Sequence, residues 1–282
     1  MNEGTEHRAF VQERWPELAV ESIERIDGGW DCWTYLVNGE WIFQFPRLPG
    51  AGDRLRTQIS VLPELAREVS SPIPVPSYAS TDPVCMGYRR IEGDPMPANV
   101  DGVWPERLGR FLYDLHLTAP EFVGMRSLPA PAIHERFRDE VEGLGTFVLP
   151  LLTTGERARA ERTIAAFFGD DGNARFATGL THGDIGPEHV LVTTSGDLAG
   201  VIDWGDLEIG DPAADLAWIL HAMPQPGDRV LGAYGGAPDD RFFERARFRF
   251  MLMPWHEVRY GAEAGLPAFV DSGMTGVRAR LL

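Results

Sequence analysis

Lysine is absent from this 282-residue chain, and all 26 of its basic residues are arginines. Any mechanism that requires a lysine side chain is therefore excluded. Cysteine is scarce, since only Cys32 and Cys85 occur, and nothing in their placement indicates an oxidising compartment. No apolar run approaches the roughly 20 residues that a membrane-spanning helix needs. The first ten residues have neither a basic start nor an apolar segment, so we expect no export signal and a cytoplasmic protein.

Positive charge is also in short supply. The formal net charge of −16 disfavours nucleic acids and anionic membranes as partners, because proteins bind phosphate backbones through Lys and Arg. Residues 1–93 contain 14 acidic residues against 9 arginines, whereas residues 94–282 contain 28 against 17. The more acidic second part favours a cationic small molecule as its ligand. An acidic surface that only aids solubility explains the charge equally well.

The rest of the composition is that of a globular protein, with 44% hydrophobic and 24% charged residues. A chain of this length can form one large domain or two lobes. We interpret residues 1–93 as a small β-rich lobe and residues 94–282 as a larger, mostly helical lobe, with a hinge at about 88–98. The predicted fold class is therefore α+β with two lobes.

The local pattern predicts the elements of each lobe. A helix at 5–19 precedes three short strands within 21–47, and Asn38-Gly39 is a strong hairpin signal. A helix at 53–69 is followed by a proline-rich loop at 70–77 and a strand at 84–93. The second lobe is expected to contain a hairpin around Ser195–Asp197. Its predicted helices span 103–118, 132–149, 155–168, 212–221 and 239–264, the last interrupted and kinked at Pro254.

The stretch THGDIGPEHVLV (residues 181–192) concentrates reactive side chains beside an apolar strand. His182-Gly183-Asp184 is followed after four residues by His189 and a strand, and a second strand leads to Asp203-Trp204-Gly205. Protein kinases have a His-x-Asp loop, a metal ligand and an Asp-x-Gly segment in this order and spacing. Because a hairpin brings its ends together, we expect Asp184, His189 and Asp203 to converge. Asp184 would then orient a hydroxyl or accept its proton, while His189 and Asp203 would hold a Mg²⁺ ion that bridges phosphates.

Other interpretations of this stretch are possible. Asp184 could be a turn residue, His189 a half-buried strand histidine and Asp203 a capping residue, although all three would have to coincide in this order. A metal hydrolase could use His182, Asp184 and His189. That alternative needs further histidines at metal-type spacing, which the sequence lacks, and it leaves the 203–205 segment unexplained.

The segment 181–220 resembles the aminoglycoside phosphotransferase family, which comprises antibiotic kinases with a protein-kinase-like fold. The resemblance continues through residues 26–47 and 88–97 and so spans most of the chain. The family usually has Asn where His189 stands, and a His there is similar to the macrolide kinases and the 2''-aminoglycoside kinases. The resemblance implies that Asp211 and Asp215 brace the segment around Asp184. We assign His182 a structural role as well.

The resemblance implies that ATP or GTP binds to the first lobe. Gly28 and Gly29 fall in the loop that would cover the phosphates, although two glycines suit any tight turn. The hinge is expected at Tyr88, Arg89 and Ile91, where an edge strand would offer backbone groups to a purine. Tyr88 would lie behind the base, and a large aromatic there is similar to the GTP-preferring branches of the family.

Two positions depart from the family pattern. Gln44 stands where the family has a strand lysine that binds the phosphates, and Gln58 stands at the position of its glutamate partner. A carboxylate opposite a neutral Gln44 would be unpaired in a partly buried place, so the two changes are chemically coherent. Three explanations are open. Arg47 or another arginine supplies the cation, or the enzyme works more slowly with metal alone, or the protein binds nucleotide or drug without efficient turnover.

The acceptor site of such enzymes lies between the catalytic loop and the C-terminal helices. The candidates in this chain are Glu188, Asp206, Glu208, Trp255, His256 and Glu257. Trp255 could equally be ordinary core packing. The acidity of the second lobe favours a cationic aminoglycoside over a macrolide, while a kinase for another small metabolite stays open because fold does not fix substrate.

Overall fold

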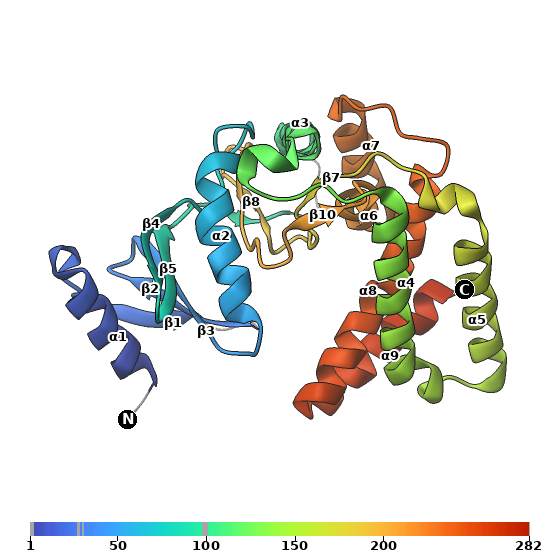
Figure 1. The fold of residues 1–282 in the computed structure, drawn as a ribbon, viewed down its shortest axis with the longest axis horizontal. Coiled ribbons are helices and arrows are strands. Elements are labelled where there is room, and N and C mark those ends of the chain that lie inside the picture. Colours follow the sequence, from blue (N-terminus) through green and yellow to red (C-terminus); the bar gives the residue numbers. More distant parts are fainter. Residues whose placement is uncertain (1–2, 27–28, 30, 98–100, 282) are drawn as a thin grey trace.

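The computed structural model describes residues 3–26, 29, 31–97 and 101–281 (Figure 1). Its N-terminal region is an antiparallel sheet with strand order β1-β2-β3-β5-β4. The strands are β1 (Ile23–Ile26), β2 (Cys32–Val37), β3 (Trp41–Pro46), β4 (Pro76–Thr81) and β5 (Val84–Arg89). Helix α1 (Glu3–Arg14) lies on one face of this sheet and α2 (Ala51–Leu65) on the other.

Alternating side chains explain this layering. Tyr35 and Phe43 pack on the α1 side with Val11, whereas Ile42 and Met86 pack on the α2 side with Leu55. The predicted β2–β3 hairpin is present, with Asn38 at φ 53° and Gly39 at φ 71°. Two consecutive left-handed residues give the type I′ turn that favours Asn-Gly.

Strand β4 differs from the sequence prediction. The proline-rich stretch before Tyr78 favoured a loop, yet residues from Pro76 onward form a strand that pairs with β5. Proline is tolerated there because it occupies the first position of an edge strand. As a result, β5 is flanked by β3 and β4, and the prediction of an edge strand at Tyr88 is wrong.

The C-terminal region is mainly helical and contains two small sheets. One has the order β6-β8-β9, from β6 (Asp94–Pro95), β8 (Val190–Val192) and β9 (Leu198–Val201), and the other pairs β7 (Gly179–Thr181) with β10 (Glu208–Gly210). The helices are α3 (Trp104–Leu117), α4 (Ala130–Val148), α5 (Thr154–Gly169), α6 (Ala213–Ala222), α7 (Pro224–Ala233), α8 (Phe242–Ala264) and α9 (Pro267–Leu281). Short 3-10 helices in this region are η2 (Pro120–Val123), η3 (Leu149–Leu151) and η4 (Asp171–Ala174), while η1 (Pro16–Leu18) follows α1 in the N-terminal region. Helices α7 and α9 are additions to those predicted.

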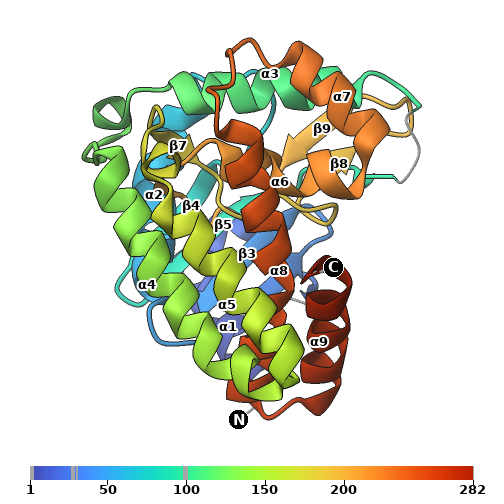
Figure 2. The ribbon, with the colours of Figure 1, turned by 90° about the vertical axis from the view of Figure 1, so that its right-hand side faces the viewer.

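Two cores organise this region. The first joins α3, α6 and α7 to the small sheets and also receives Leu62 and Leu65 from α2. The second lies among α4, α5, α8 and α9, which Figure 2 shows as a bundle below α3 and α7. Since α2 contributes to the first of these cores, the two lobes share apolar packing. The division between residues 93 and 94 stays a prediction.

Helix α8 is not interrupted at Pro254, contrary to the expectation from sequence. It runs through Pro254, whose side chain lies against Gly276 of α9, where an added Cβ would come within 2.9 Å. Gly273 allows a similar approach to Val258. This close α8–α9 packing holds the helix in place around the proline. In the described ranges, no helix has both the length and the apolar character needed to cross a membrane.

Candidate active site

The β8–β9 hairpin brings three of the predicted residues together. Val190 pairs with Val201, and the Ile202 N–H donates to the His189 carbonyl at 2.9 Å, so His189 and Asp203 lie at the same end of the hairpin. His189 Nε2 is 3.6 Å from Asp203 Oδ2, and His189 Nδ1 is 3.5 Å from Asp184 Oδ2. The two carboxylates and the imidazole therefore converge.

The orientation of His189 is fixed by one hydrogen bond. Its Nδ1 lies 2.8 Å from the carbonyl oxygen of Asp184 and donates to it, so Nε2 is the nitrogen that faces Asp203. Burial alone would lower the pKa of His189. The carboxylate of Asp203, the hydrogen bond to Asp184 and the carboxylate of Asp184 outweigh burial, and the pKa is raised.

Asp203 is presented by an unusual backbone conformation. Its φ of 63° is left-handed, a region that Asp visits more readily than most residues. The following Trp204 is buried and donates from Nε1 to the Val201 carbonyl at 3.0 Å, which anchors the turn. The Asp203 side chain stays 51% exposed and can reach a ligand.

Asp184 combines accessibility with a shifted proton affinity. Burial raises its pKa to about 6, the carboxylates of Asp206, Asp203 and Glu188 add to the rise, and His189 opposes it. Nevertheless, 59% of its side-chain surface is accessible, so the carboxylate is recessed among acidic groups but open on one side. A carboxylate with this pKa is suited to accept a proton near neutral pH.

Buried hydrogen bonds brace the backbone at Asp184. Asp215, which has no exposed surface, accepts from the N–H groups of His182 at 2.8 Å and Gly183 at 2.9 Å. His116 Nε2 lies 3.0 Å from the same carboxylate, and its Nδ1 lies 2.8 Å from the Tyr234 hydroxyl. Gly183 has φ +85°, and a Cβ there would lie 2.5 Å from the Asp206 carbonyl. The arrangement matches the bracing role that the resemblance implies for Asp215.

A second buried network holds the chain after the hairpin. Asp211 accepts from the Ala213 N–H at the start of α6 and pairs with Arg245 of α8 at 2.8 Å. Arg245 is 2% exposed and also pairs with Asp239 at 2.8 Å. Sequence reasoning did not identify His116 or Arg245 as partners, because each is distant in sequence from the carboxylate it contacts and carries no spacing signal.

His182 is not available as a metal ligand. It has no exposed surface, its Nε2 donates to the Ile202 carbonyl at 3.0 Å, and its Nδ1 accepts from the Asp184 N–H at 3.3 Å. Burial lowers its pKa, which keeps the ring neutral. Within the described residues, no group of three or more His, Cys, Asp or Glu side chains is arranged to hold a metal ion. Since both ring nitrogens of His182 are hydrogen-bonded, His182 does not offer the metal ligand that the hydrolase alternative assigns to it.

A magnesium ion that is bound to a nucleotide needs fewer protein ligands. Mg²⁺ in such sites is held by one or two protein ligands together with phosphates and water. Asp203 has an exposed carboxylate. The Nε2 atom of His189, which is not the nitrogen bonded to the Asp184 carbonyl, faces this carboxylate. This donor pair fits a metal that arrives with its phosphates.

On the sheet side, Gln44 lies opposite Thr34 and Met86, and alternation places it on the face toward α2. Gln58 of α2 is 6% exposed. Tyr88 is buried on the same face, and its pKa is raised by burial and further by the charge of Asp203. Tyr88 therefore lies on the side of the sheet that faces the hairpin.

The other residues predicted to bind the nucleotide have no described contact with the converging residues. The backbone of Arg89 pairs with Trp41, while its side chain is 69% exposed and lies 3.7 Å from Glu40. Ile91 is half-buried against Gly200 of β9. Gly29 is close to the Cys32 carbonyl, whereas Gly28 lies outside the described residues. Backbone groups beyond Tyr88, where pairing with β4 ends, are those open to a base.

Two arginines of the N-terminal region differ in where their charge lies. Arg47 stacks on Trp33, 4.5 Å from the ring centroid, and Trp33 packs on the α1 side of the sheet, away from Gln44. Arg54 of α2 forms an ion pair with Asp31, just before β2. Burial raises the pKa of Asp206, and Arg54 is the nearby charge that most opposes this rise. The sequence suggestion of Arg47 as the cation is thus not supported, while Arg54 lies close to the hairpin.

Acidic side chains border the site on the side of α4. Glu208 pairs with Arg136 of α4 at 2.7 Å, and Asp206 is exposed. Glu140 of α4 is close enough for its charge to raise the pKa values of both Asp206 and Glu208, in which burial is the largest cause. Glu188 acts similarly on Asp184. Sequence reasoning missed Glu140 because a lone acid on a helix surface is not distinctive.

The candidates on α8 require correction. Trp255 has no exposed surface and packs in the second core with Phe248, so it cannot contact a ligand. Its place on the inward face of an amphipathic helix explains this burial. His256 is exposed and lies 3.7 Å from Glu140, and Glu257 is near enough to Arg280 of α9 to influence its pKa, which burial lowers.

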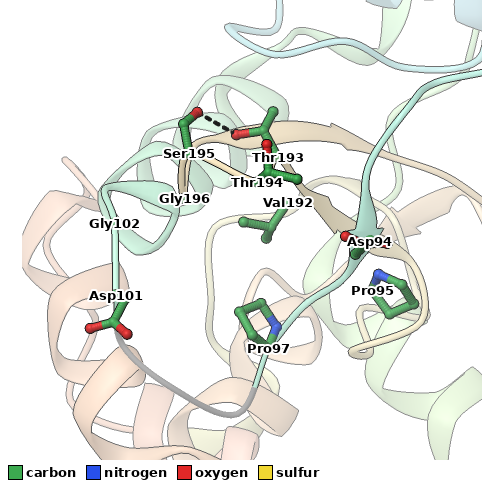
Figure 3. Close-up of a pocket in the computed structure, with 10 residues that line it drawn as sticks. All are labelled: Asp94, Pro95, Pro97, Asp101, Gly102, Val192, Thr193, Thr194, Ser195 and Gly196. Atoms are coloured by element: carbon green, nitrogen blue, oxygen red, sulfur yellow. Dashed lines mark hydrogen bonds between the residues drawn. The ribbon is translucent and has the colours of Figure 1, made fainter.

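A pocket of about 340 Å³ lies elsewhere (Figure 3). Strand pairing puts the β8–β9 turn beside this pocket at the opposite end of the hairpin from His189. The pocket is lined by the β8–β9 turn and by the segment around β6, where Thr193 and Ser195 hydrogen-bond at 2.9 Å. Because none of the converging side chains lines it, we assign it no part in the chemistry.

Comparisons with known proteins show which family the chain is similar to. The family described as "Phosphotransferase enzyme family" matches residues 22–251. Viomycin phosphotransferase of Streptomyces vinaceus is 29% identical over an alignment of 246 residues, and the match covers 82% of this chain and 82% of that protein. An aminoglycoside 2'-phosphotransferase-IIIa in complex with GDP superposes with a TM-score of 0.85 at 22% identity, over 99% of both chains. The macrolide 2'-phosphotransferase MphH of Brachybacterium faecium gives 0.72 at 20% identity, over 95% of this chain and 97% of the other.

Proposed function

Because the chain belongs to the phosphotransferase enzyme family, we propose that it transfers the γ-phosphoryl group of ATP or GTP to a hydroxyl of a cationic antibiotic of the aminoglycoside type. The observation that carries this proposal is the convergence of Asp184, His189 and Asp203 at one end of the hairpin.

In this proposal the Asp184 carboxylate accepts a hydrogen bond from the acceptor hydroxyl and then takes its proton. The acceptor oxygen forms a bond to the γ-phosphorus, the bond from that phosphorus to the bridging oxygen breaks, and the hydroxyl proton passes to Asp184. Its pKa of about 6 and its accessible carboxylate support this role. The backbone bonds to Asp215 hold the loop in position while the two substrates meet.

His189 and Asp203 are the residues that would hold Mg²⁺. When bound, the ion neutralises phosphate charge and stabilises the charge that develops during transfer. The sheet side would contain the nucleotide, with the Gly28–Gly29 loop over the phosphates, Gln44 and Gln58 nearby, and Tyr88 to Ile91 at the base. A similar protein structure that contains GDP supports a purine nucleotide in general, so both ATP and GTP are candidate donors.

The acidic border favours a polycationic acceptor. Glu188 and Asp206 act electrostatically on Asp184, and Glu140 acts on both Asp206 and Glu208. The summed charge of these acidic residues would attract cations. Glu257 remains a weaker candidate from the adjacent helix. The names of similar proteins add viomycin and macrolides as alternative acceptors.

A phosphorylation assay with a panel of acceptors tests the proposal. Purified protein is incubated with ATP or GTP, Mg²⁺ and one aminoglycoside, viomycin or a macrolide, and phosphorylated product is identified by mass spectrometry. We expect a mass gain of one phosphoryl group on an aminoglycoside, absent with Asp184→Ala. The same yield from that variant would overturn the proposed mechanism.

A second candidate function is nucleotide or drug binding with little turnover. Gln44 and Gln58 support it, because Gln44 lacks the positive charge of the family's strand lysine and Gln58 lacks the carboxylate that pairs with that lysine. Tight nucleotide binding without product from any acceptor would favour this candidate.

A further inference from the structure

The phosphates of the proposed nucleotide lack a cation from the sheet. Gln44 is neutral, Arg47 is stacked on Trp33 on the other face, and the chain has no lysine. A nucleoside triphosphate would therefore meet mainly negative side chains at the lobe junction, including Asp31, Asp203 and Asp206. Charge neutralisation by a nearby arginine would change this balance considerably.

The geometry points to Arg54 of α2 as the residue that binds the β- and γ-phosphates of the nucleotide, in place of a strand lysine. This inference rests on the proposed function. Arg54 lies one helical turn before Gln58, so the two share a helix face. The positive charge would thus come from the helix instead of the strand.

One ion pair places the Arg54 guanidinium at the junction, and two electrostatic effects are consistent with that place. The guanidinium is ion-paired with Asp31, whose carbonyl accepts from the Arg47 N–H immediately after β3. Its charge acts on Asp206 of the hairpin segment. Its charge also acts on Cys32, as does that of Asp203, so the thiol lies within electrostatic reach of both. Both charges therefore act at the start of β2, next to the Arg54–Asp31 ion pair.

The chemistry of the guanidinium suits this task. It has five N–H donors in a planar fork that matches phosphate, and the contact with Asp31 uses one of its nitrogens. The Arg54 side chain is 38% exposed, so solvent and a phosphate can reach it. Asp31 would orient the guanidinium until the nucleotide arrives.

Two other arginines of the N-terminal region, Arg56 and Arg25, have different partners. Arg56, two residues further on α2, pairs with Asp53 at 2.8 Å and donates to the Thr81 carbonyl. Arg25 stacks on Trp33 beside Arg47. Arg56 is thus a matched control, on the same helix and with the same charge.

The test measures ATP and GTP dissociation constants by calorimetry, with Mg²⁺, for wild type, Arg54→Ala, Arg54→Lys and Arg56→Ala. Loss of a charged hydrogen bond to phosphate predicts roughly 10- to 100-fold weaker triphosphate binding for Arg54→Ala. We expect a smaller loss for Arg54→Lys and none for Arg56→Ala. Binding of adenosine or guanosine, which lack phosphates, should not change.

A second pair of variants separates a phosphate contact from a structural effect. Gln44→Lys restores a cation on the strand, so it should recover triphosphate binding in the Arg54→Ala background. Circular dichroism and thermal unfolding verify that each variant is folded. Equal triphosphate affinity for wild type and Arg54→Ala would overturn the inference alone. Failure of the wild type to bind either triphosphate would overturn both the proposed function and this inference.

Discussion

The two sides of the candidate site are built in different ways. The hairpin side is fixed by buried hydrogen bonds, with Asp215 contacting His182 and Gly183 and Asp211 contacting Arg245. The sheet side presents two amides, Gln44 and Gln58, and one partly exposed arginine, Arg54. In the proposed function, positioning of the acceptor hydroxyl would depend on rigid packing, whereas phosphate binding would depend on charge that can be supplied from more than one place.

The largest effect should come from the group proposed to receive the proton. Asp184→Ala should lower kcat by about 10²- to 10⁴-fold, the range for removal of a general base, while the nucleotide dissociation constant stays close to that of wild type. Steady-state kinetics and calorimetry measure the two quantities. Asp197→Asn at the far end of the hairpin is the control and should retain activity. An Asp184→Ala variant with the kcat of wild type would contradict the role of the hairpin side in accepting the proton.

Asp215 tests whether the hairpin side depends on buried bracing. Asp215→Ala leaves two backbone N–H groups and His116 without their acceptor, so unfolding free energy should fall by about 3–5 kcal/mol. Urea denaturation measures this loss, and the exposed Asp228→Ala should change it by less than about 0.5 kcal/mol. An equally small change for both would show that the network contributes little.

The same carboxylate gives a pH dependence with a defined sign. Burial alone would raise the pKa of Asp215, but the hydrogen bond and charge of His116 outweigh it and lower the pKa in the folded state. Its contribution is therefore complete above the usual pKa of about 3.9 and is lost as the pH falls through the lower folded value. The stability difference between wild type and Asp215→Asn should shrink in acid below about pH 4. A difference that grows there would contradict the sign.

The proposed metal ligands should differ from each other. Asp203→Asn removes the anionic oxygen donor, so the Mg²⁺ concentration for half-maximal activity should rise by about 10- to 100-fold. His189→Asn replaces the imidazole nitrogen with an amide oxygen, which can still bind Mg²⁺, so the half-maximal Mg²⁺ concentration should shift less. Titration of activity with Mg²⁺ measures both. Identical titrations for both variants and wild type would place the metal elsewhere.

The smallest effect is expected on the sheet side. If Arg54 already supplies the phosphate cation, Gln44→Lys in the wild-type background should change kcat/KM by less than about 5-fold, the scale of an exposed ion pair. An increase of several hundredfold would show that the sheet side lacks a cation altogether.

Much of the fold and the core of the site could be predicted from the sequence. Hairpin signals at Asn38-Gly39 and Ser195–Asp197, with the spacing of Asp184, His189 and Asp203, depend on local geometry that a sequence encodes directly. Contacts between distant segments could not be found in this way. Examples are Arg54 beside the hairpin, and Trp255 in the core.

Turn and breaker rules failed where tertiary pairing overrode them. Pro76 indicated a loop, but an edge strand tolerates a proline at its first position, and β4 then made β5 an interior strand. Pro254 indicated an interrupted helix, but packing against α9 accommodates it. Both errors concern residues whose outcome depends on a neighbour absent from the local pattern.

A crystal structure with Mn²⁺ and a non-hydrolysable triphosphate tests the convergence of Asp184, His189 and Asp203 most directly. Anomalous scattering locates the metal without reference to the protein atoms. We expect the ion bound to Asp203 and His189, with the terminal phosphate between it and the Asp184 carboxylate. A metal and phosphate bound away from these three side chains would contradict the proposed site.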